Sequence, residues 1–252
     1  VLNKIFYMEE VLYIYSPIVD WKDLQNKVCL LLNQIGLVAE CEKKMATPRG
    51  EVEVDVYAID PNSIDAISYV IECKNWNNSI NQSIIHSFIT IMYETGCNIG
   101  YIVSKIGFQS GAINYTKNTN IKLFTFEEFQ KHYFKIWMKK YFLHRLDILL
   151  ERANYYFEPI NCARDRAVYI LPPDKKEKYK LLRQQYERFI LEVDVLSFKL
   201  KNTSFAYNDI HNFLLQCKSL GLEFSSIYLY DIQIQLEKFI NGIVSEFDQL
   251  FD

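Results

Sequence analysis

The sequence lacks the residue groupings on which several classes of protein depend. Its six cysteines include no CxxC pair, and none of its four histidines stands at zinc-ligand spacing from a cysteine, so a structural zinc site is not expected. No histidine has a nucleophile motif around it, which argues against a Ser–His or Cys–His enzyme. Cysteines scattered in this way are typical of a reducing compartment.

Long apolar runs are absent as well. No stretch reaches the roughly 20 residues that a membrane-spanning helix needs, and the first residues have neither the charged start nor the apolar region of a secretory signal. We therefore expect a cytoplasmic protein that is not associated with a membrane. No repeat or low-complexity tract interrupts the 252 residues, and 50% of them are hydrophobic, which is enough to bury one large core or two modest ones.

The first half of the chain alternates between helix and strand patterns. Strict alternation of apolar and polar residues, clearest at Val52, Val54 and Val56, predicts a half-buried strand. Residues 3–15 have a spacing compatible with a helix. The remaining predicted order is helix, three strands, helix, strand, helix and strand, over residues 20–34, 37–41, 51–58, 68–74, 80–95, 99–104, 109–117 and 121–126.

After about residue 130 the patterns become helical throughout, and strand signals almost disappear. The predicted helices cover about 131–156, 174–201, 207–219 and 227–250. We therefore predict two domains, residues 1–130 and residues 131–252. The formal net charge is −3, but residues 131–190 hold fourteen Lys or Arg against seven Asp or Glu. This basic segment includes two clusters that can contact phosphates, Lys131, Lys135, Lys139 and Lys140 in the first, and Lys175, Lys176, Lys178, Lys180 and Arg183 in the second.

Two neighbouring predicted strands carry the candidate catalytic residues. Glu72 and Lys74 are two residues apart in one strand, so their side chains point to the same face. Asp55 lies on the polar side of the preceding strand, and pairing of the two strands brings it towards Glu72. Two close carboxylates repel each other, and a divalent cation removes that repulsion. Oxygen ligands of this kind favour Mg²⁺, and the carbonyl oxygen of Cys73 is a further candidate ligand.

This set of residues suits hydrolysis of a phosphodiester bond. A bound metal ion lowers the pKa of a water molecule and neutralises charge that builds on the phosphate. Lys74 can orient the water and stabilise the transition state. An ExK sequence by itself is common on solvated strand faces, so the prediction depends on its context: an Asp in one strand, ExK at the end of the next, and an amphipathic helix directly after it.

That context resembles a known family. Residues 50–56 (GEVEVDV) and 69–76 (YVIECKNW) are similar to the Mrr-like branch of the PD-(D/E)xK, or restriction-endonuclease-like, superfamily. The resemblance covers about residues 20–130. It implies an α/β (α+β) fold with a central mixed sheet of about five strands flanked by helices, to which this chain adds an all-α C-terminal region. It also implies catalytic roles for Asp55, Glu72 and Lys74, and for Gln82 in the following helix.

The family pattern and this chain differ at one position of the expected metal site. The first helix of the family often carries an acidic residue that completes the site, and the apparent equivalent here is Gln25. Glu53 or Glu40 can compensate, and Glu53 is the better candidate because it shares the face of Asp55. The predicted metal ligands are therefore Asp55, Glu72, Cys73 and Glu53, with Mg²⁺ as the cofactor and Mn²⁺ as an alternative.

The expected function is that of a metal-dependent DNA endonuclease, as in a bacterial restriction or anti-phage defence system. The helical region would contact nucleic acid, mediate dimerisation or sense a trigger. Cutting both strands of a duplex favours a homodimer or a larger assembly, which can include other defence subunits. Two alternatives stay open: a catalytically weak member of the fold that acts as a nucleic-acid-binding or assembly subunit, with Gln25 as the clue, and a nuclease directed at RNA.

Overall fold

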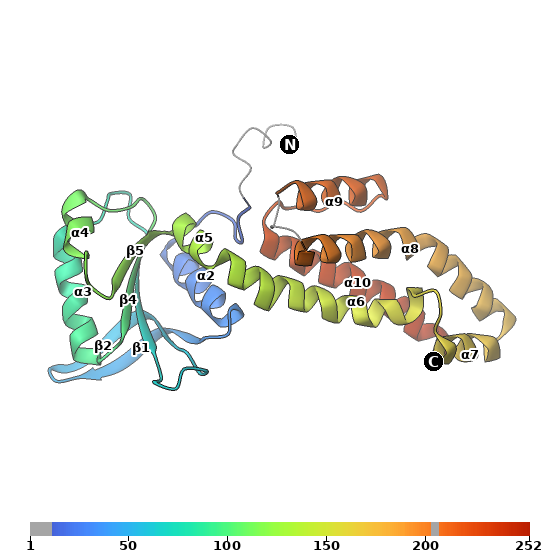
Figure 1. Ribbon diagram of the computed structural model, residues 1–252, viewed down its shortest axis with the longest axis horizontal. Coiled ribbons are helices and arrows are strands. Elements are labelled where there is room, and N and C mark those ends of the chain that lie inside the picture. The colour runs from blue at the N-terminus through green and yellow to red at the C-terminus, as the bar shows by residue number, and fades with distance from the viewer. Residues whose placement is uncertain (1–11, 203–206) are drawn as a thin grey trace. The chain divides into compact units, whose positions relative to one another are not determined.

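The computed structural model describes residues 12–202 and 207–252, and the chain divides into two compact units (Figure 1). The sheet unit comprises Tyr15–Tyr141. The helical unit comprises Phe142–Asp252 together with the residues before Tyr15. Most of the helix predicted over residues 3–15 lies outside the described residues. No helix in the described ranges is long and apolar enough to cross a membrane.

A five-stranded mixed sheet forms the centre of the sheet unit, in the spatial order β1-β2-β3-β4-β5. Neighbouring strands are antiparallel from β1 to β3 and parallel from β3 to β5. This arrangement confirms the predicted fold class. The strands are β1 (Val38–Thr47), β2 (Gly50–Ile59), β3 (Ser68–Lys74), β4 (Ile99–Ser104) and β5 (Ile121–Thr125).

Helices cover both faces of the sheet. On one face lie α2 (Trp21–Gln34), which packs on β1, β2 and β3, and α5 (Phe126–Trp137), which packs on β4 and β5. On the other lie α3 (Gln82–Thr95) and α4 (Ser110–Tyr115), as Figure 1 shows. A π-helical segment, Met138–Phe142, follows α5. Helices therefore pack on both faces of the sheet.

Local chemistry fixes the starts of these helices. The Asp20 side chain accepts a hydrogen bond from the Asp23 N–H at the start of α2. Thr125 and Glu128 form the predicted reciprocal capping box at the start of α5. Such caps satisfy backbone donors that the first helical turn leaves without partners.

One strand boundary was predicted wrongly. The first strand was expected to end near residue 41, but β1 continues to Thr47 and pairs with β2 along its length. Residues 42–47 are mostly charged or polar, so their sequence gives no apolar alternation to detect. β1 is an edge strand, and its residues alternate between exposed and half-buried. Backbone pairing with β2 therefore stabilises it more than apolar burial does.

The helical unit is built from α6 (Leu143–Phe157), α7 (Cys162–Ile170), α8 (Pro173–Asn202), α9 (Tyr207–Ser219) and α10 (Leu229–Phe251). α8 packs against each of the other four helices. The sequence patterns predicted four of these helices and missed α7, which has a weak apolar face. α7 is anchored instead by Arg164, a buried side chain that donates hydrogen bonds to the carbonyl oxygens of Tyr156 and Glu158.

Gly100 of β4 lies directly against side chains of α3. A Cβ atom at this position would meet the ring of Phe88 at 2.6 Å and would clash with the Met92 sulfur. Phe88 and Met92 are buried members of the core between the sheet and α3. Glycine is therefore required here because there is no space for a side chain, and not because of its backbone angles.

We predict that Gly100→Ala lowers the free energy of unfolding by about 1–3 kcal/mol, because the added methyl group must displace buried side chains. Chemical denaturation measures the change. The control is Gly111→Ala, an exposed helical position of α4 whose new Cβ atom would make an ordinary contact of 3.5 Å. That variant should keep or slightly raise stability. Equal stability of the two variants would show that the space at Gly100 is not limiting.

Candidate active site

The site is organised around the carboxylate of Asp55, which lies where β2 separates from β3. Backbone pairing of these two strands runs from Ile59↔Ser68 to Val56↔Ile71. Asp55 is the next residue of β2, and its Oδ2 accepts a hydrogen bond of 2.7 Å from the Cys73 N–H. Its Oδ1 accepts a bond of 2.8 Å from Nε2 of Gln25 in α2. The side chain therefore links three elements at the point where the sheet opens.

Glu72 and Lys74 lie beside Asp55 at the end of β3. They form an ion pair, and each side chain is 20% exposed. Burial raises the pKa of the Glu72 carboxyl group above its usual value, and the negative charge of Asp55 raises it further, although Lys74 acts in the opposite direction. The structure thus places Asp55 close enough to Glu72 for the two charges to interact, as the strand arrangement predicted.

Cys73 contributes to the site through its backbone. Its side chain is buried, and burial raises the pKa of the thiol well above the usual value. The thiol therefore stays protonated and is a poor nucleophile. The sequence prediction gave Cys73 a backbone role, as a carbonyl ligand, and its N–H already holds Asp55.

A cavity of about 490 Å³ opens in front of Asp55. Two amide oxygens in its wall, Gln25 Oε1 and Asn75 Oδ1, are buried and have no hydrogen-bond partner among residues 12–202 and 207–252. A buried polar oxygen without a partner is costly, so these two atoms indicate that something which donates or binds to oxygen belongs there. The lining residues are Val19, Asp20, Trp21, Gln25, Glu42, Glu53, Asp55, Cys73, Lys74, Asn75 and Trp76.

The other predicted residues fall in different places. Glu53 lines the cavity, whereas Glu40 does not and is paired with Lys43. Gln82 lies at the first turn of α3, where its Nε2 is 3.4 Å from Nε2 of His86. It does not line the cavity, so its catalytic role stays a prediction based on the family pattern.

Sequence patterns gave no sign of two lining residues, Trp21 and Asn75. Each could have been identified as a lining residue only from its position relative to the other motifs. Trp21 is one helical turn before Gln25, and Asn75 directly follows Lys74. A residue one turn away from a site residue lies on the same side of the helix. Such a residue, or one that directly follows a motif at the end of a strand, is therefore a candidate lining residue.

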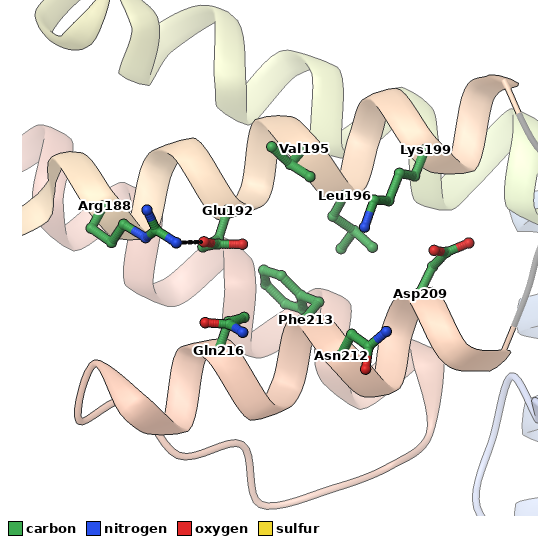
Figure 2. Close-up of a pocket in the computed structure, with 9 residues that line it drawn as sticks. All are labelled: Arg188, Glu192, Val195, Leu196, Lys199, Asp209, Asn212, Phe213 and Gln216. Carbon is green, nitrogen blue, oxygen red and sulfur yellow. Dashed lines mark ion pairs between the residues drawn. The ribbon is translucent and has the colours of Figure 1, made fainter.

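Another cavity, of about 340 Å³, lies between α8 and α9 in the helical unit (Figure 2). Its charged side chains balance each other: Arg188 forms an ion pair of 2.7 Å with Glu192, and Lys199 and Asp209 lie towards its other end (Figure 2). It contains no pair of close carboxylates, so it does not offer the chemistry of the Asp55 cavity.

Comparison with known proteins agrees with the sheet unit's geometry. Residues 18–133 match the family model Mrr_cat, described as restriction endonuclease. This stretch, a little under half of the chain, is therefore a restriction-endonuclease domain of the Mrr_cat type, and the predicted resemblance is confirmed. Its limits lie close to those of the sheet unit, Tyr15–Tyr141. No curated protein has a significant match to the chain.

Two solved structures have weak similarity. One is described as a protein of unknown function, AF1548, with 17% sequence identity and a TM-score of 0.38, and the alignment covers 88% of this chain and 100% of that one. The other is a repair endonuclease from Pyrococcus abyssi, with 15% identity and a TM-score of 0.32, covering 45% of this chain and 50% of that one.

The raised pKa of Glu72 leads to a prediction about stability in the absence of metal. A carboxyl group whose pKa is higher in the folded state favours folding at low pH, and this contribution is lost as the pH rises through the folded-state pKa. At neutral pH the ionised Glu72 therefore costs stability. Glu72→Gln should raise the free energy of unfolding at pH 7 in EDTA. The gain should shrink as the pH falls through the raised folded-state pKa, and it should be gone below the ordinary pKa of a glutamate.

Denaturation at pH 7 and at pH 4 tests this. Glu51→Gln is the control, because Glu51 is an exposed partner of Lys44 at 3.6 Å and such pairs contribute only about 0–1 kcal/mol. A Glu72→Gln protein that is less stable than the parent at pH 7 would contradict the inferred repulsion at the site.

Proposed function

We propose that the chain is a divalent-metal-dependent endonuclease that hydrolyses phosphodiester bonds of DNA, with Asp55, Glu72 and Lys74 as its active-site triad. One observation carries the proposal: the Asp55 carboxylate, held at the opening of the sheet, lies beside the half-buried Glu72–Lys74 pair and faces a cavity. The restriction-endonuclease family of residues 18–133 supports nuclease activity.

The residues at and beside the cavity suit a hard divalent cation. Glu72 does not line the cavity itself, but it is paired with the lining residue Lys74. The carboxylates of Asp55 and Glu72 supply negative oxygen donors, and Gln25 Oε1 is a buried oxygen that lacks a partner. Mg²⁺ prefers oxygen ligands of this kind, and Mn²⁺ accepts the same set. Among the described residues no three His, Cys, Asp or Glu side chains are grouped as a metal site. Binding by this chain would therefore depend on two carboxylates completed by the Cys73 carbonyl, Glu53 or the Gln25 amide.

Each residue has a separate task in the proposed reaction. When bound, the cation makes a water molecule a better nucleophile and offsets charge on the phosphate. Asp55 is kept in position by the Gln25 amide and the Cys73 N–H. Lys74 exchanges its ion pair with Glu72 for the phosphate oxygen that gains charge in the transition state, and so stabilises it. The half-buried setting strengthens this interaction, because less water screens it.

The proposed nuclease activity also suggests a biological role for the protein. We propose a bacterial restriction or anti-phage effector that acts as a homodimer or within a larger defence assembly. Under this proposal the helical unit contacts nucleic acid, mediates assembly or senses the trigger. The candidate phosphate contacts are the basic cluster that begins in α5, at the end of the sheet unit, and the basic cluster of α8 in the helical unit.

The alternative, a catalytically weak assembly subunit, rests on one observation. Gln25 brings no charge to the site, and in the described structure both oxygens of Asp55 and the carboxylate of Glu72 already have protein partners. The experiments below separate the two proposals, because a scaffold would bind nucleic acid without cutting it. Including an RNA substrate distinguishes an RNA-directed nuclease.

We predict that Asp55→Ala, Glu72→Gln and Lys74→Met each reduce cleavage about 100-fold or more, because each removes a ligand or a transition-state contact. Cleavage of plasmid DNA, linear DNA and RNA is followed on gels with Mg²⁺, with Mn²⁺ and with EDTA. Mg²⁺ or Mn²⁺ should support activity, and EDTA should abolish it.

The neighbouring Glu40–Lys43 pair provides matched controls, because it has the same two charges on β1 but does not line the cavity. Glu40→Gln and Lys43→Met should cut at the parent's rate. If Glu72→Gln also cuts at that rate, or if cleavage continues in EDTA after full dialysis, the assigned site is wrong.

A second prediction concerns the neutral residue Gln25. Gln25→Glu adds a negative charge next to Asp55 and should raise the affinity for Mg²⁺ and Mn²⁺ by about tenfold or more, because affinity for hard cations rises with the charge of the ligands. Isothermal titration calorimetry measures this without any turnover. Asn26→Asp is the control, since it adds the same charge at the next, exposed position of α2. If both variants bind metal equally well, the Gln25 side chain is not part of the metal site.

A further inference from the structure

The chain's three tryptophans are divided unequally between the core and the surface. Trp137 is fully buried, whereas Trp21 and Trp76 are 56% and 46% exposed. Both exposed tryptophans line the Asp55 cavity, although they come from different elements, the first residue of α2 and the segment after β3. Large aromatic side chains left partly in water at a cavity mark a place where something binds.

Each exposed indole ring also has a lysine above it. The Lys74 ammonium group lies 5.3 Å from the centroid of the Trp76 ring, and the Lys22 ammonium group lies 5.5 Å from that of Trp21. A flat ring next to a cation matches the two parts of a nucleotide, because the ring can stack on a base and the cation can contact its phosphate.

The charge of the cavity limits what can hold a substrate there. Its lining carries one lysine, Lys74, and four carboxylates, those of Asp20, Glu42, Glu53 and Asp55. Glu42 is paired with Lys22, so three carboxylates remain against Lys74. A metal ion would neutralise part of this charge, but the remainder repels a polyanion. Attraction to phosphate therefore cannot by itself keep DNA at this site, and an uncharged contact is needed. Stacking of a base on an indole ring is such a contact and contributes about 1–3 kcal/mol per base.

A paired base in a duplex is not free to make this contact. Its two faces are covered by the neighbouring base pairs, and exposing one costs a few kcal/mol of unstacking. A base in an unpaired strand has a free face. The cavity, at about 490 Å³, is within the range of about 300–1,000 Å³ in which small ligands bind, so a nucleotide rather than a whole duplex matches its size.

We propose that Trp21 and Trp76 form a stacking platform for the bases of an unpaired DNA strand, so that the segment entering the Asp55 cavity is single-stranded or frayed. This inference rests on the proposed function, and it specifies the form of the substrate. The two rings set substrate preference by binding, while Asp55, Glu72 and Lys74 carry the reaction.

Equilibrium binding to the full chain in EDTA tests the platform without turnover. The probes are a fluorescent single-stranded oligonucleotide and the blunt duplex of the same sequence. Trp21→Ala and Trp76→Ala should each weaken single-strand binding roughly tenfold or more, with little change for the duplex. The Phe variants at the same positions keep an aromatic ring, so they should bind between the parent and the Ala variants.

The salt dependence separates stacking from charge. Loss of a phosphate contact flattens the plot of log K against log salt by roughly 0.7 for a single strand. The two Trp→Ala variants should therefore lower affinity with the slope unchanged. Lys131→Glu and Lys135→Glu, in the basic cluster of α5, provide the comparison, because any affinity they lose through phosphate contacts must come with a flatter slope.

Tyr93→Ala is the matched control for removal of an exposed aromatic residue. Tyr93 is 88% exposed on α3 and does not line the Asp55 cavity, so this variant should bind like the parent. Intrinsic fluorescence adds a direct measurement: an oligonucleotide should quench the parent, and Trp21→Phe and Trp76→Phe should each lose part of that quenching.

Unchanged single-strand affinity in both Trp→Ala variants, or equal losses for single strand and duplex, would overturn the stacking platform. Neither result depends on cleavage. The proposed function fails separately, if the parent cuts no nucleic acid with Mg²⁺ or Mn²⁺ while the binding differences persist. If the parent cuts but the Trp variants bind normally, the endonuclease proposal stands and the platform does not.

Discussion

Where the backbone pairing of β2 and β3 ends, the carboxylate of Asp55 forms the next hydrogen bond between the two strands. Beyond Val56↔Ile71 the two strands no longer pair, yet β2 stays paired with β1, and β3 stays paired with β4 up to Lys74↔Ser104. The sheet therefore opens between β2 and β3, and Asp55 connects the two strands through the Cys73 N–H. The opening leaves room for a cavity, and the connection fixes which side chain faces it. A change in strand register would remove both at once.

The architecture of the sheet unit was readable from the sequence because its strongest patterns coincide with its most buried elements. β3 and β4 were predicted at their observed limits. β4 is a short, largely apolar run, and β3 was recognised as the partner of the alternating strand before it. The prediction ended β1 too early, because its residues are exposed or half-buried at the edge of the sheet. Backbone pairing with β2 stabilises them, and the sequence shows no apolar alternation there. α7 was missed for a related reason: a buried Arg164 that donates to backbone carbonyl oxygens leaves no apolar periodicity.

The part of the site that was predictable depends on strand periodicity, which determines the face of the sheet to which each side chain points. Glu72 and Lys74 had to share a face, and Asp55 had to approach them once the strands paired. Contacts between the helix and the strands were not predictable, because nothing in the sequence reports the hydrogen bond from Gln25 to Asp55. The same holds for Trp21, which reaches the cavity only because α2 packs over β1, β2 and β3. Gln82, placed by family pattern, lies next to His86 instead of lining the cavity.

The helical unit is assembled from two separate stretches of the chain, and this has a consequence for biosynthesis. The carbonyl oxygens of Tyr13 and Ile14 accept hydrogen bonds from the N–H groups of Leu229 and Tyr230 at the start of α10. These partners lie more than 200 positions apart in the sequence. During translation Tyr13 and Ile14 leave the ribosome long before α10, so their hydrogen-bond partners are not yet available. All strands of the intervening sheet unit are synthesised before α10. Because domains generally fold as units during synthesis, the sheet unit is expected to fold before Tyr13 and Ile14 have found their partners in α10.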